Sequence, residues 1–426
     1  MAGPLRIGVV GMARILPSHL RGWKALLDAG LCDFRVTALV GRSPEGALSF
    51  RRRGEGPPPR PPVMPGGDPL AAPHMYVSDL HGDTLPECYA DVPAMLAAGA
   101  VDAAVLLTPV GLHHGQALAC LSAGVHVLCE KPLAVSVRAG AAMVAEAERR
   151  GLVLGLAEGV RYDASVRLQR WAVESGPVGP VEMMALGGLA SYWAPDRIVA
   201  ETPWRHRKVE AGGGPAIDIG VHQFAHVRAV AGEVREVSAV TARVAAERFT
   251  RDAAGAVVAA VACDVEDVYH AAFRLEGGGT GQLSFSWCGR GPASFWPGGS
   301  VVYGARGMCR GGRLALPDGE VLLEERARAE LGADVWERWF PRGVRDTKGL
   351  QFLDFVRTVE RRRGGDRGAQ MEASGREGLH ELAAAFAILE SAAAGRAVTL
   401  QEVLHGRART YQREIDEHWG LTAPGA

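Results

Sequence analysis

The chain has 426 residues, of which 47% are hydrophobic and 22% are charged, and its formal net charge is -1. This composition is typical of a globular protein with room for two or three domains, and it excludes a largely disordered chain. The small net charge argues against a broad nucleic-acid-binding face.

The cysteines and the apolar runs indicate the compartment. None of the seven cysteines forms a CxxC pair or a zinc-ligand spacing, which is typical of free thiols in a reducing compartment. No apolar run reaches the roughly 18–20 residues of a membrane-spanning helix, and the first residues lack the pattern of a signal peptide. We therefore expect a cytoplasmic protein that binds no membrane.

The first part of the chain alternates short apolar runs with segments of helical spacing. Residues 5–10 (LRIGVV) and 34–40 (FRVTALV) are apolar runs, and a helical segment follows the first of them. Strands of this kind, each followed by a helix, predict a parallel sheet with both faces covered. The other expected elements are strands at 101–107, 125–129 and 152–157 and helices at 90–99, 113–123 and 136–150. These elements predict a Rossmann-type, doubly wound α/β domain over residues 1–158, with its ligand at the carboxyl ends of the strands.

A stretch rich in Pro, Arg and Gly interrupts this alternation at about residues 51–73 (RRRGEGPPPRPPVMPGGDPLAAP). Prolines at this density are incompatible with a helix or a central strand. We interpret the stretch as a long surface insertion, and a solvated loop without function is favoured over a binding motif.

Residues 159–426 are predicted to form a second domain of the α+β class. Runs of alternating polarity joined by Gly-rich turns indicate a mostly antiparallel sheet with one covered face. These runs lie at 234–245, 256–263, 268–275 and 280–287, and helices are expected at 349–363 and 376–394.

The turn after the first strand has the position of a dinucleotide-binding fingerprint. Gly8 lies in the strand and Gly11 at its end, followed by Met12, Ala13, Arg14 and Ile15. In such a turn the glycines let the backbone approach a pyrophosphate, whose charge lies at a helix N-terminus. Ala13 and Leu16 replace the second and third glycines of the pattern, so the fingerprint is degenerate, and a turn that binds nothing is the alternative.

At the end of the second strand, an NAD-binding fold usually places an acidic residue on the ribose hydroxyls. This chain has Gly41, Arg42 and Ser43 there. A cation and a hydroxyl suit a 2′-phosphate better than a bare diol, so the sequence favours NADP(H) over NAD(H). The alternative for Arg42 is a solvated surface arginine.

Polar residues follow two later strands of the predicted sheet. Thr108, Pro109 and His113 come after one strand, and Glu130 and Lys131 come after the next. A lysine at the mouth of the sheet could bind a substrate hydroxyl and stabilise charge during hydride transfer. A neighbouring Glu–Lys pair is also often only a solvated ion pair.

A third cluster begins at Trp204 and Arg205 and continues in a Gly-rich turn that leads to Asp218 and His222. We expect one helix to carry Asp218 and His222 at positions i and i+4, on one face. Histidine exchanges a proton near neutral pH, and a carboxylate can orient it. Because no third ligand follows at a suitable spacing, no metal site is expected.

These motifs resemble the glucose–fructose oxidoreductase / inositol dehydrogenase / rhizopine-catabolism (Gfo/Idh/MocA) family. The resemblance rests on GVVG…HL, TPVGLHHGQAL, AGVHVLCEKPLA, WRHRKVEAGGGPAIDIGVHQFAH and the late segment that ends SAAAGRAVTL, all in the family's order. Two features depart from the family pattern: the altered turn at Ala13 and Leu16, and the Pro-rich insertion. Both lie near the nucleotide and leave the catalytic cluster intact.

The resemblance implies a Rossmann domain, a second domain on a large, mostly antiparallel sheet, and an active site at the junction of the two. It implies that Lys131 contacts the reacting hydroxyl and the cofactor, that Asp218 binds substrate and that His222 is the acid/base. A sugar, cyclitol or other polyol substrate and a homodimer or homotetramer are implied as well. Further substrate contacts are expected among Arg161, Tyr162, Trp193, Trp204, Arg205 and His226, each of which also has a packing explanation.

Three alternatives to a net dehydrogenase or reductase acting on CH–OH stay open. Relatives with this fold include redox-neutral glycosidases or epimerase-type enzymes with bound nucleotide, and nucleotide-sensing binding proteins. An imine or enone reductase of sugar tailoring would use the same residues. Retention of Lys131, Asp218 and His222 favours an enzyme over a sensor.

Overall fold

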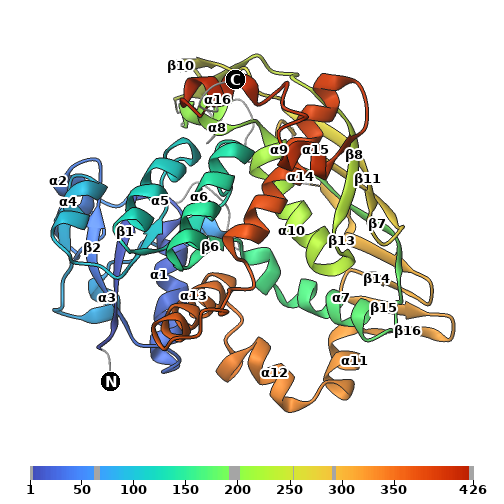
Figure 1. The fold of residues 1–426 in the computed structure, drawn as a ribbon, viewed down its shortest axis with the longest axis horizontal. Helices are drawn as coiled ribbons and strands as arrows, with labels where there is room; N and C mark the ends of the chain where they lie inside the picture. The colour runs from blue at the N-terminus through green and yellow to red at the C-terminus, as the bar shows by residue number, and fades with distance from the viewer. Residues whose placement is uncertain (1–2, 62–67, 191–201, 253, 290–293, 422–426) are drawn as a thin grey trace. The chain divides into compact units, whose positions relative to one another are not determined.

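The computed structural model describes residues 3–61, 68–190, 202–252, 254–289 and 294–421 (Figure 1). The chain divides into two compact units. The first contains Met1–Leu133, Gly140–Tyr162 and Glu337–Gly378, and the second contains Ala134–Ala139, Asp163–Trp336 and Leu379–Ala426. None of the described helices is long and apolar enough to cross a membrane.

The first unit is built on a six-stranded parallel sheet in the order β3-β2-β1-β4-β5-β6. The strands are β1 (Leu5–Val10), β2 (Phe34–Val40), β3 (Glu87–Tyr89), β4 (Ala103–Leu106), β5 (His126–Glu130) and β6 (Leu154–Ala157). This is the strand order of a dinucleotide-binding fold, in which the crevice opens beside β1, where the order reverses. The predicted Rossmann-type sheet is therefore confirmed.

The helices of the first unit cover this sheet. They are α1 (Leu16–Asp28), α2 (Pro44–Leu48), α3 (Ser78–His81), α4 (Val92–Ala97), α5 (His113–Ser122), α13 (Thr347–Arg363) and most of α6 (Val137–Arg150). Short 3-10 helices are η1 (Pro69–Ala71), η2 (Val110–Leu112), η3 (Gly159–Tyr162) and η5 (Pro341–Gly343).

Helix α13 comes from late in the chain but belongs to the first unit. Trp23 of α1 stacks on Phe352 of α13 with ring centroids 4.4 Å apart, and Phe34 of β2 meets the same ring edge-on. The buried face of α13 also carries Phe355 and Val356. We expected residues 349–363 to form a helix of the second domain; the helix is present, and its apolar face packs on α1 (Figure 1).

The second unit contains a nine-stranded sheet in the order β16-β15-β14-β13-β7-β12-β11-β8-β17. Only the β7–β12 pair is parallel among its described pairs, so the sheet is mixed. The strands are β7 (Val181–Leu189), β8 (Val234–Ala242), β11 (Val268–Leu275), β12 (Thr280–Ser286), β13 (Ser294–Gly304), β14 (Met308–Arg310), β15 (Arg313–Leu316), β16 (Gly319–Leu322) and β17 (Val398–Thr399). The strand expected at 256–263 forms instead a separate hairpin, β9 (Glu247–Arg251) with β10 (Val257–Ala262).

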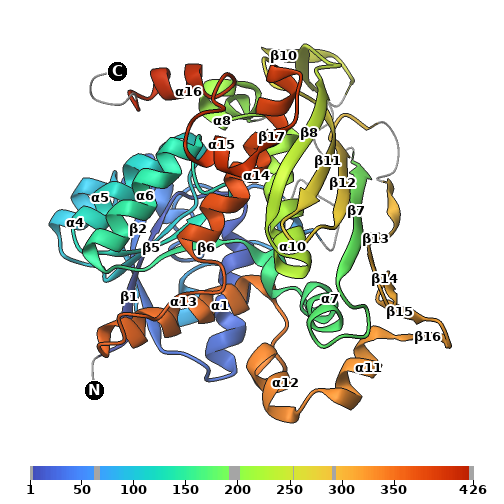
Figure 2. The same cartoon turned by 45° about the vertical axis from the view of Figure 1, so that its right-hand side comes forward.

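One face of the large sheet is covered by helices. The residues of β11 alternate strictly between buried and more exposed, as expected for a strand with one covered face. Tyr269 on the buried face donates its hydroxyl to Gln223 of α10 (Gly220–Ala231), and Phe224 packs against Phe273. Figure 2 shows α10 and α14 (Gly375–Ala394) on this side of the strands. The other helices are α7 (Ala164–Glu174), η4 (Pro203–His206), α8 (Lys208–Ala211), α9 (Pro215–Asp218), α11 (Leu323–Glu330), α12 (Ala333–Trp339), α15 (Leu400–Leu404) and α16 (Arg413–His418).

Candidate active site

The turn after β1 has the geometry that a dinucleotide requires at Gly11. This residue has φ 98°, and its N–H donates to the carbonyl of Val40 at 2.9 Å. A Cβ there would lie 2.9 Å from Thr108 Cγ2, so only glycine fits. Gly8, which we had assigned to cofactor binding, lies inside β1, where a Cβ would come within 2.6 Å of Met95 Sδ. Packing therefore explains Gly8.

Ala13 and Leu16, the departures from the fingerprint, are accommodated without strain. Arg342 is the only non-glycine residue with positive φ in the described part of the chain, so Ala13 has an ordinary backbone. Leu16 is fully buried and packs into the core at the start of α1. The first turn of this 13-residue helix carries no acidic side chain, and its N-terminus favours an anion. These features fit a pyrophosphate at the turn.

At the end of β2, Arg42 is exposed and Ser43 begins α2. The Ser43 hydroxyl accepts the N–H of Gly46 at 3.1 Å and caps that helix. Ser43 therefore caps a helix, in addition to the cofactor contact that the sequence predicts.

His113 links two loops of the sheet. One ring nitrogen lies 2.8 Å from the carbonyl oxygen of Thr108 and the other 2.9 Å from that of Pro132. The Thr108 hydroxyl donates to Gln116 at 2.6 Å. Because His113 is buried and both ring nitrogens face backbone carbonyls, it positions the two loops. Its contact with the cofactor stays a prediction.

Glu130 is a buried carboxylate whose ion-pair partner, Lys348, lies 218 residues later in the sequence. Its Oε1 accepts from Lys348 Nζ of α13 at 2.6 Å and lies 2.7 Å from His19 Nε2 of α1. Its Oε2 accepts the backbone N–H of Lys131 at 3.1 Å. Burial alone would raise the pKa of this carboxyl, but the charge of Lys348 and the contact with His19 hold the pKa well below its usual value. Glu130 thus fixes the backbone of Lys131, and its contact with the cofactor stays a prediction.

Two of the expected substrate contacts in the first unit have structural partners. Arg161 Nη2 donates to Glu377 Oε2 at 2.6 Å, and the arginine side chain is almost fully buried. The Tyr162 hydroxyl donates to Asp354 Oδ2 at 2.7 Å. Each side chain therefore has a structural role, and its contact with substrate stays a prediction. Pro109 directly precedes η2, at the carboxyl side of β4.

In the second unit, Asp218 and His222 lie on two consecutive helices and not on one. Asp218 ends α9 and His222 lies in the first turn of α10, and Ile219 lies between the two helices with φ -108° and ψ -37°. The prediction of a continuous helix is therefore wrong. Asp218 Oδ2 lies 3.7 Å from Arg205 Nε, and the Arg205 guanidinium stacks on Trp204 at 4.2 Å. Trp204, Arg205 and Asp218 thus lie close together, and their contacts with substrate stay a prediction.

Two further expected contacts have different outcomes. His226 Nε2 lies 2.9 Å from Gln169 Oε1, and burial lowers the pKa of this histidine to about 4. It is therefore a partly buried, hydrogen-bonded side chain. Trp193 lies outside the described residues.

A buried carboxyl that the sequence did not reveal holds the Gly-rich turn. Glu266 Oε1 accepts the N–H of Ala216 in α9 at 2.9 Å. A Cβ at Gly214 would lie 2.0 Å from the carbonyl oxygen of Glu266, which explains this glycine of the Gly212–Gly214 run. Burial raises the pKa of Glu266 to about 7. Glu266 is thus a titratable group in direct contact with the helix that carries Asp218.

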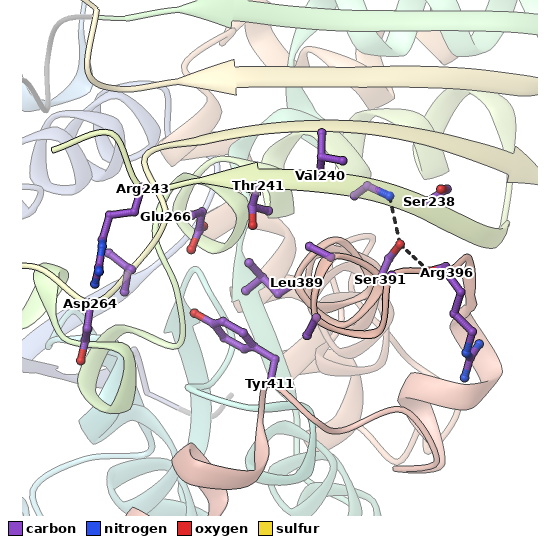
Figure 3. Close-up of a pocket in the computed structure, with 15 residues that line it drawn as sticks. Ser238, Val240, Thr241, Arg243, Asp264, Glu266, Leu389, Ser391, Arg396 and Tyr411 are labelled. Carbon is purple, nitrogen blue, oxygen red and sulfur yellow. Dashed lines mark hydrogen bonds between the residues drawn. The ribbon is translucent and has the colours of Figure 1, made fainter. Parts of the chain in front are cut away.

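Behind this turn lies a pocket of about 660 Å³ within the second unit. Figure 3 shows the Tyr411 hydroxyl pointing toward the Glu266 carboxyl across the pocket, with β8 on one side and α14 on the other. Glu266 Oε2 and the Tyr411 hydroxyl are buried and have no hydrogen-bond partner in the described part of the chain. The pocket gives the second oxygen of Glu266 a polar but unpaired environment, which agrees with its raised pKa.

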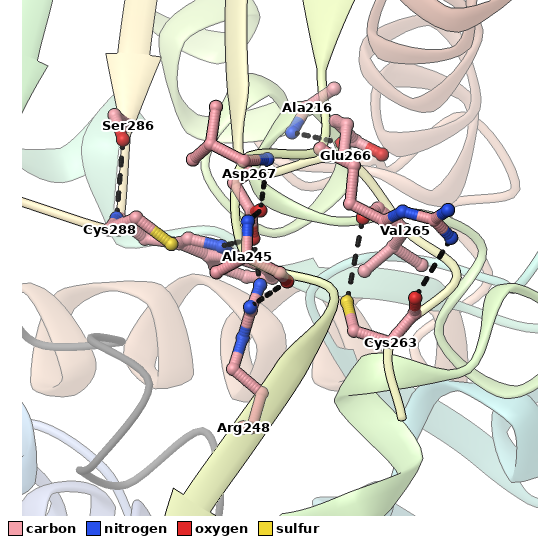
Figure 4. A network of polar contacts seen from close by, with 12 residues as sticks. Ala216, Ala245, Arg248, Cys263, Val265, Glu266, Asp267, Ser286 and Cys288 are labelled. Atoms are coloured by element: carbon pink, nitrogen blue, oxygen red, sulfur yellow. Dashed lines mark hydrogen bonds and ion pairs between the residues drawn. The ribbon is translucent and has the colours of Figure 1, made fainter. Parts of the chain in front are cut away.

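A second buried network holds the segment that contains Glu266. Asp267 pairs with the buried Arg248, and it accepts the N–H of Val244 at 2.8 Å and the indole N–H of Trp287 at 3.1 Å (Figure 4). Arg248 and Asp267 are fully buried. A buried ion pair with this many hydrogen bonds fixes one local arrangement. No group of three or more metal-ligating side chains is found among the described residues.

Comparison with known proteins places these features in one family. The family description "Oxidoreductase family, NAD-binding Rossmann fold" matches residues 76–158, and "GFO/IDH/MocA C-terminal domain" matches residues 166–310. Together the two matches cover more than half of the chain. The first contains Lys131, and the second contains Asp218 and His222.

Several relatives are named as sugar or cyclitol oxidoreductases. A 1,5-anhydro-D-fructose reductase of Ensifer adhaerens is 38% identical over 130 residues, which are 30% of this chain and 38% of that protein. The rhizopine catabolism protein MocA of Rhizobium meliloti is 26% identical over 272 residues, 62% of this chain and 74% of that protein. The chain spans only 34–38% of the length of the Ensifer reductase, of an uncharacterized oxidoreductase of Bacillus subtilis and of a levoglucosan dehydrogenase of Pseudarthrobacter phenanthrenivorans.

Solved structures share the fold over nearly the whole chain. A levoglucosan dehydrogenase in complex with NADH and levoglucosan has a TM-score of 0.70 at 20% identity, covering 93% of this chain and 99% of that one. An oxidoreductase domain protein from Kribbella flavida has a TM-score of 0.71 at 21% identity, covering 94% and 100%. With two matching domains, this fold and the described site residues, the chain belongs to the GFO/IDH/MocA family of NAD-binding oxidoreductases.

Proposed function

We propose that this protein is an NAD(P)-dependent dehydrogenase or reductase that acts on a CH–OH carbon of a sugar, cyclitol or related polyol. The observation that carries the proposal is the intact acid–base set. Lys131 directly follows β5, and its backbone is fixed by Glu130, while Asp218 and His222 flank the break between α9 and α10. The named activities of the relatives support the same reaction class.

The residues divide the work of alcohol oxidation. His222 accepts the proton of the substrate hydroxyl, because imidazole exchanges protons near neutral pH. Lys131 polarises the hydroxyl oxygen as the carbon–oxygen double bond forms. Asp218, held near Arg205, orients the substrate or the imidazole. The oxidised nicotinamide, when bound, supplies the hydride acceptor for the hydrogen on the same carbon.

For the cofactor, we propose a preference for NADP(H) over NAD(H). Arg42 is exposed at the end of β2, where an NAD-binding fold usually has a carboxylate. A guanidinium pairs well with a phosphate oxygen. Arg42→Ala is expected to weaken binding of NADP(H) more than binding of NAD(H), measured by calorimetric titration. Equal loss for both cofactors would reject the role of Arg42 at the 2′-phosphate.

A substrate screen tests the reaction class. The purified protein is mixed with NADP+ or NAD+ and a panel of sugars, cyclitols and polyols, and reduction of the nicotinamide is followed by absorbance. Turnover that consumes the cofactor stoichiometrically with product supports net oxidation. Product formed without net consumption would identify a redox-neutral reaction, and binding without any turnover would identify a sensor.

We also propose that the protein forms a homodimer or homotetramer through the uncovered face of the large sheet. This face exposes apolar side chains that include Val240, Met183 and Tyr303, which are 65%, 46% and 49% exposed. The last two are cross-strand neighbours of β7 and β13. Light scattering after gel filtration measures the assembly, and Val240→Glu is expected to shift it toward the monomer. A monomeric wild-type protein would contradict the proposal.

A further inference from the structure

The Pro-rich insertion is held firmly where it leaves and rejoins the first unit. The N–H of Val77 donates to the carbonyl of Phe50 at 2.8 Å and closes the base of the insertion. Close to this closure, His74 Nε2 lies 3.0 Å from the carbonyl oxygen of Ser49, and its ring packs on that of Phe50 at 4.4 Å. The two ends of the insertion are thus fixed side by side.

The described middle of the insertion reaches the nucleotide turn. Arg60 Nη2 donates to the carbonyl of Met12 at 2.5 Å. In the opposite direction, Arg14 Nη1 donates to the carbonyl of Pro61 at 3.2 Å. These reciprocal bonds join Arg60 and Pro61 to the segment between β1 and α1, so this part of the insertion lies beside the turn that is expected to hold the pyrophosphate.

This arrangement gathers three positive charges. Although Arg60 is an exposed residue, partial desolvation and the charges of Arg14 and Arg42 lower its pKa. The neighbours that act on Arg60 are thus cations, and within the described ranges no carboxylate forms an ion pair with Arg60 or Arg42. Arg60 and Arg42 are like charges that repel each other, and an anion between them would relieve the repulsion.

We propose that Arg60 of the insertion, together with Arg42 and Arg14, forms an anion site that binds the 2′-phosphate of an adenine dinucleotide. The carboxyl end of β2 is where this fold places the adenosine ribose. Guanidinium groups bind phosphate through paired, charge-assisted hydrogen bonds. The inference rests on the proposed NADP(H) preference and adds to it a residue from the insertion, which the sequence favoured as a loop without function.

Calorimetric titration of the full-length protein with NADP+ and with NAD+ tests the inference, because the two ligands differ only in the 2′-phosphate. Arg60→Gln is expected to weaken NADP+ binding by at least about tenfold and NAD+ binding by less than about threefold. Arg60→Lys keeps the charge and is expected to retain part of the NADP+ preference. Arg52→Gln removes the same charge from an exposed position of the same insertion and is expected to leave both affinities unchanged. Circular dichroism verifies that each variant is folded.

The remaining outcomes separate this inference from the proposed preference. If the wild-type protein binds NADP+ no better than NAD+, both the preference and the anion site fail. If Arg42→Ala abolishes a preference for NADP+ while Arg60→Gln behaves like Arg52→Gln, the preference stands and the role of Arg60 is overturned. If Arg60→Gln weakens both ligands equally, Arg60 acts on the turn through Met12 and not on the 2′-phosphate, which also overturns the inference.

Discussion

Lys348 is the cation that balances Glu130 inside the first unit, and replacing it with methionine tests this link directly. The side chains of Lys348 and Glu130 are 12% and 10% exposed, and that of His19 is fully buried. Lys348→Met retains much of the apolar stem but removes the ammonium that lies 2.6 Å from Glu130 Oε1. The carboxylate keeps the N–H of Lys131 and the ring of His19 as partners.

Breaking a buried ion pair by removing one partner typically costs about 3–5 kcal/mol. Because two partners of Glu130 remain, we expect a loss near the lower end, about 3 kcal/mol in the free energy of unfolding. The double variant Glu130→Gln/Lys348→Met leaves no charge unpaired and is expected to recover at least about 1 kcal/mol of that loss.

The loss should also depend on pH. Burial first and the charge of Lys348 second lower the pKa of His19 in the folded wild type. Without the ammonium, the folded pKa of His19 rises toward that of a histidine paired with a carboxylate. A higher folded pKa contributes stability at low pH that is lost as the pH rises through it. The deficit of Lys348→Met is therefore expected to be smaller near about pH 5.5 than near about pH 8.

The measurement is urea denaturation of the full-length variants, followed by circular dichroism at both pH values. Hydrogen exchange of residues 347–363 assigns the loss to the first unit, since the two units can unfold separately. A single variant within about 1 kcal/mol of wild type at both pH values would refute the role of Lys348. A double variant no more stable than the single would show that pairing of Glu130 is not the cause.

Three further changes test the described site. Lys131→Ala and His222→Ala are each expected to lower kcat by at least about a hundredfold while the fold survives, measured by steady-state kinetics and circular dichroism; wild-type turnover would remove that residue from the mechanism. Gly214→Ala should lower the melting temperature markedly, because its Cβ would lie 2.0 Å from a backbone oxygen of Glu266; an unchanged melting temperature would contradict this packing. Burial raises the pKa of Glu266 to about 7. The protonated form therefore contributes stability that is fully present below the unfolded pKa of about 4.3 and is lost as the pH rises to about 7. Glu266→Gln should remove this pH-dependent loss of unfolding free energy in denaturation curves, and a pH dependence identical to that of the wild type would contradict the role of Glu266.

Local sequence patterns predicted most elements of the fold well. The bounds of β1, β2 and β11 agree with the predicted runs, because a buried parallel strand is apolar throughout and a half-covered strand alternates. Helix α13 was also predicted from the sequence, but its packing in the first unit was not. Its apolar face would pack equally well on any complementary surface, and nothing local identifies Trp23 as its partner.

The candidate site was predicted in its residue types more than in its contacts. Lys131, Asp218 and His222 followed from motifs, and the cluster of Arg205 with Asp218 was expected. Lys348 could not be found, because its bond to Glu130 spans 218 residues. The break at Ile219 was missed as well, since a helical period continues across it in the sequence.

The insertion shows why composition alone misjudges a segment. Its prolines exclude regular structure, and that part of the interpretation agrees with the described residues, where only η1 is helical. Composition does not show where the ends of a loop are fixed. The hydrogen bond from the Val77 N–H to the Phe50 carbonyl fixes the ends of the insertion, and so limits which residues its arginines can contact. A loop held in this way can contribute a binding residue without any secondary structure of its own.

Both segments that carry candidate catalytic residues depend on a buried carboxyl group. Glu130 accepts the N–H of Lys131, and Glu266 accepts the N–H of Ala216 two residues before Asp218. Each carboxyl fixes a backbone and not a side chain, so a substitution there can displace the catalytic group while leaving it chemically intact. A displacement of about 1 Å at a reacting group can reduce the rate about a hundredfold. Glu130→Gln and Glu266→Gln are therefore expected to act mainly on kcat, and a change confined to KM would indicate that these carboxyls influence substrate binding instead.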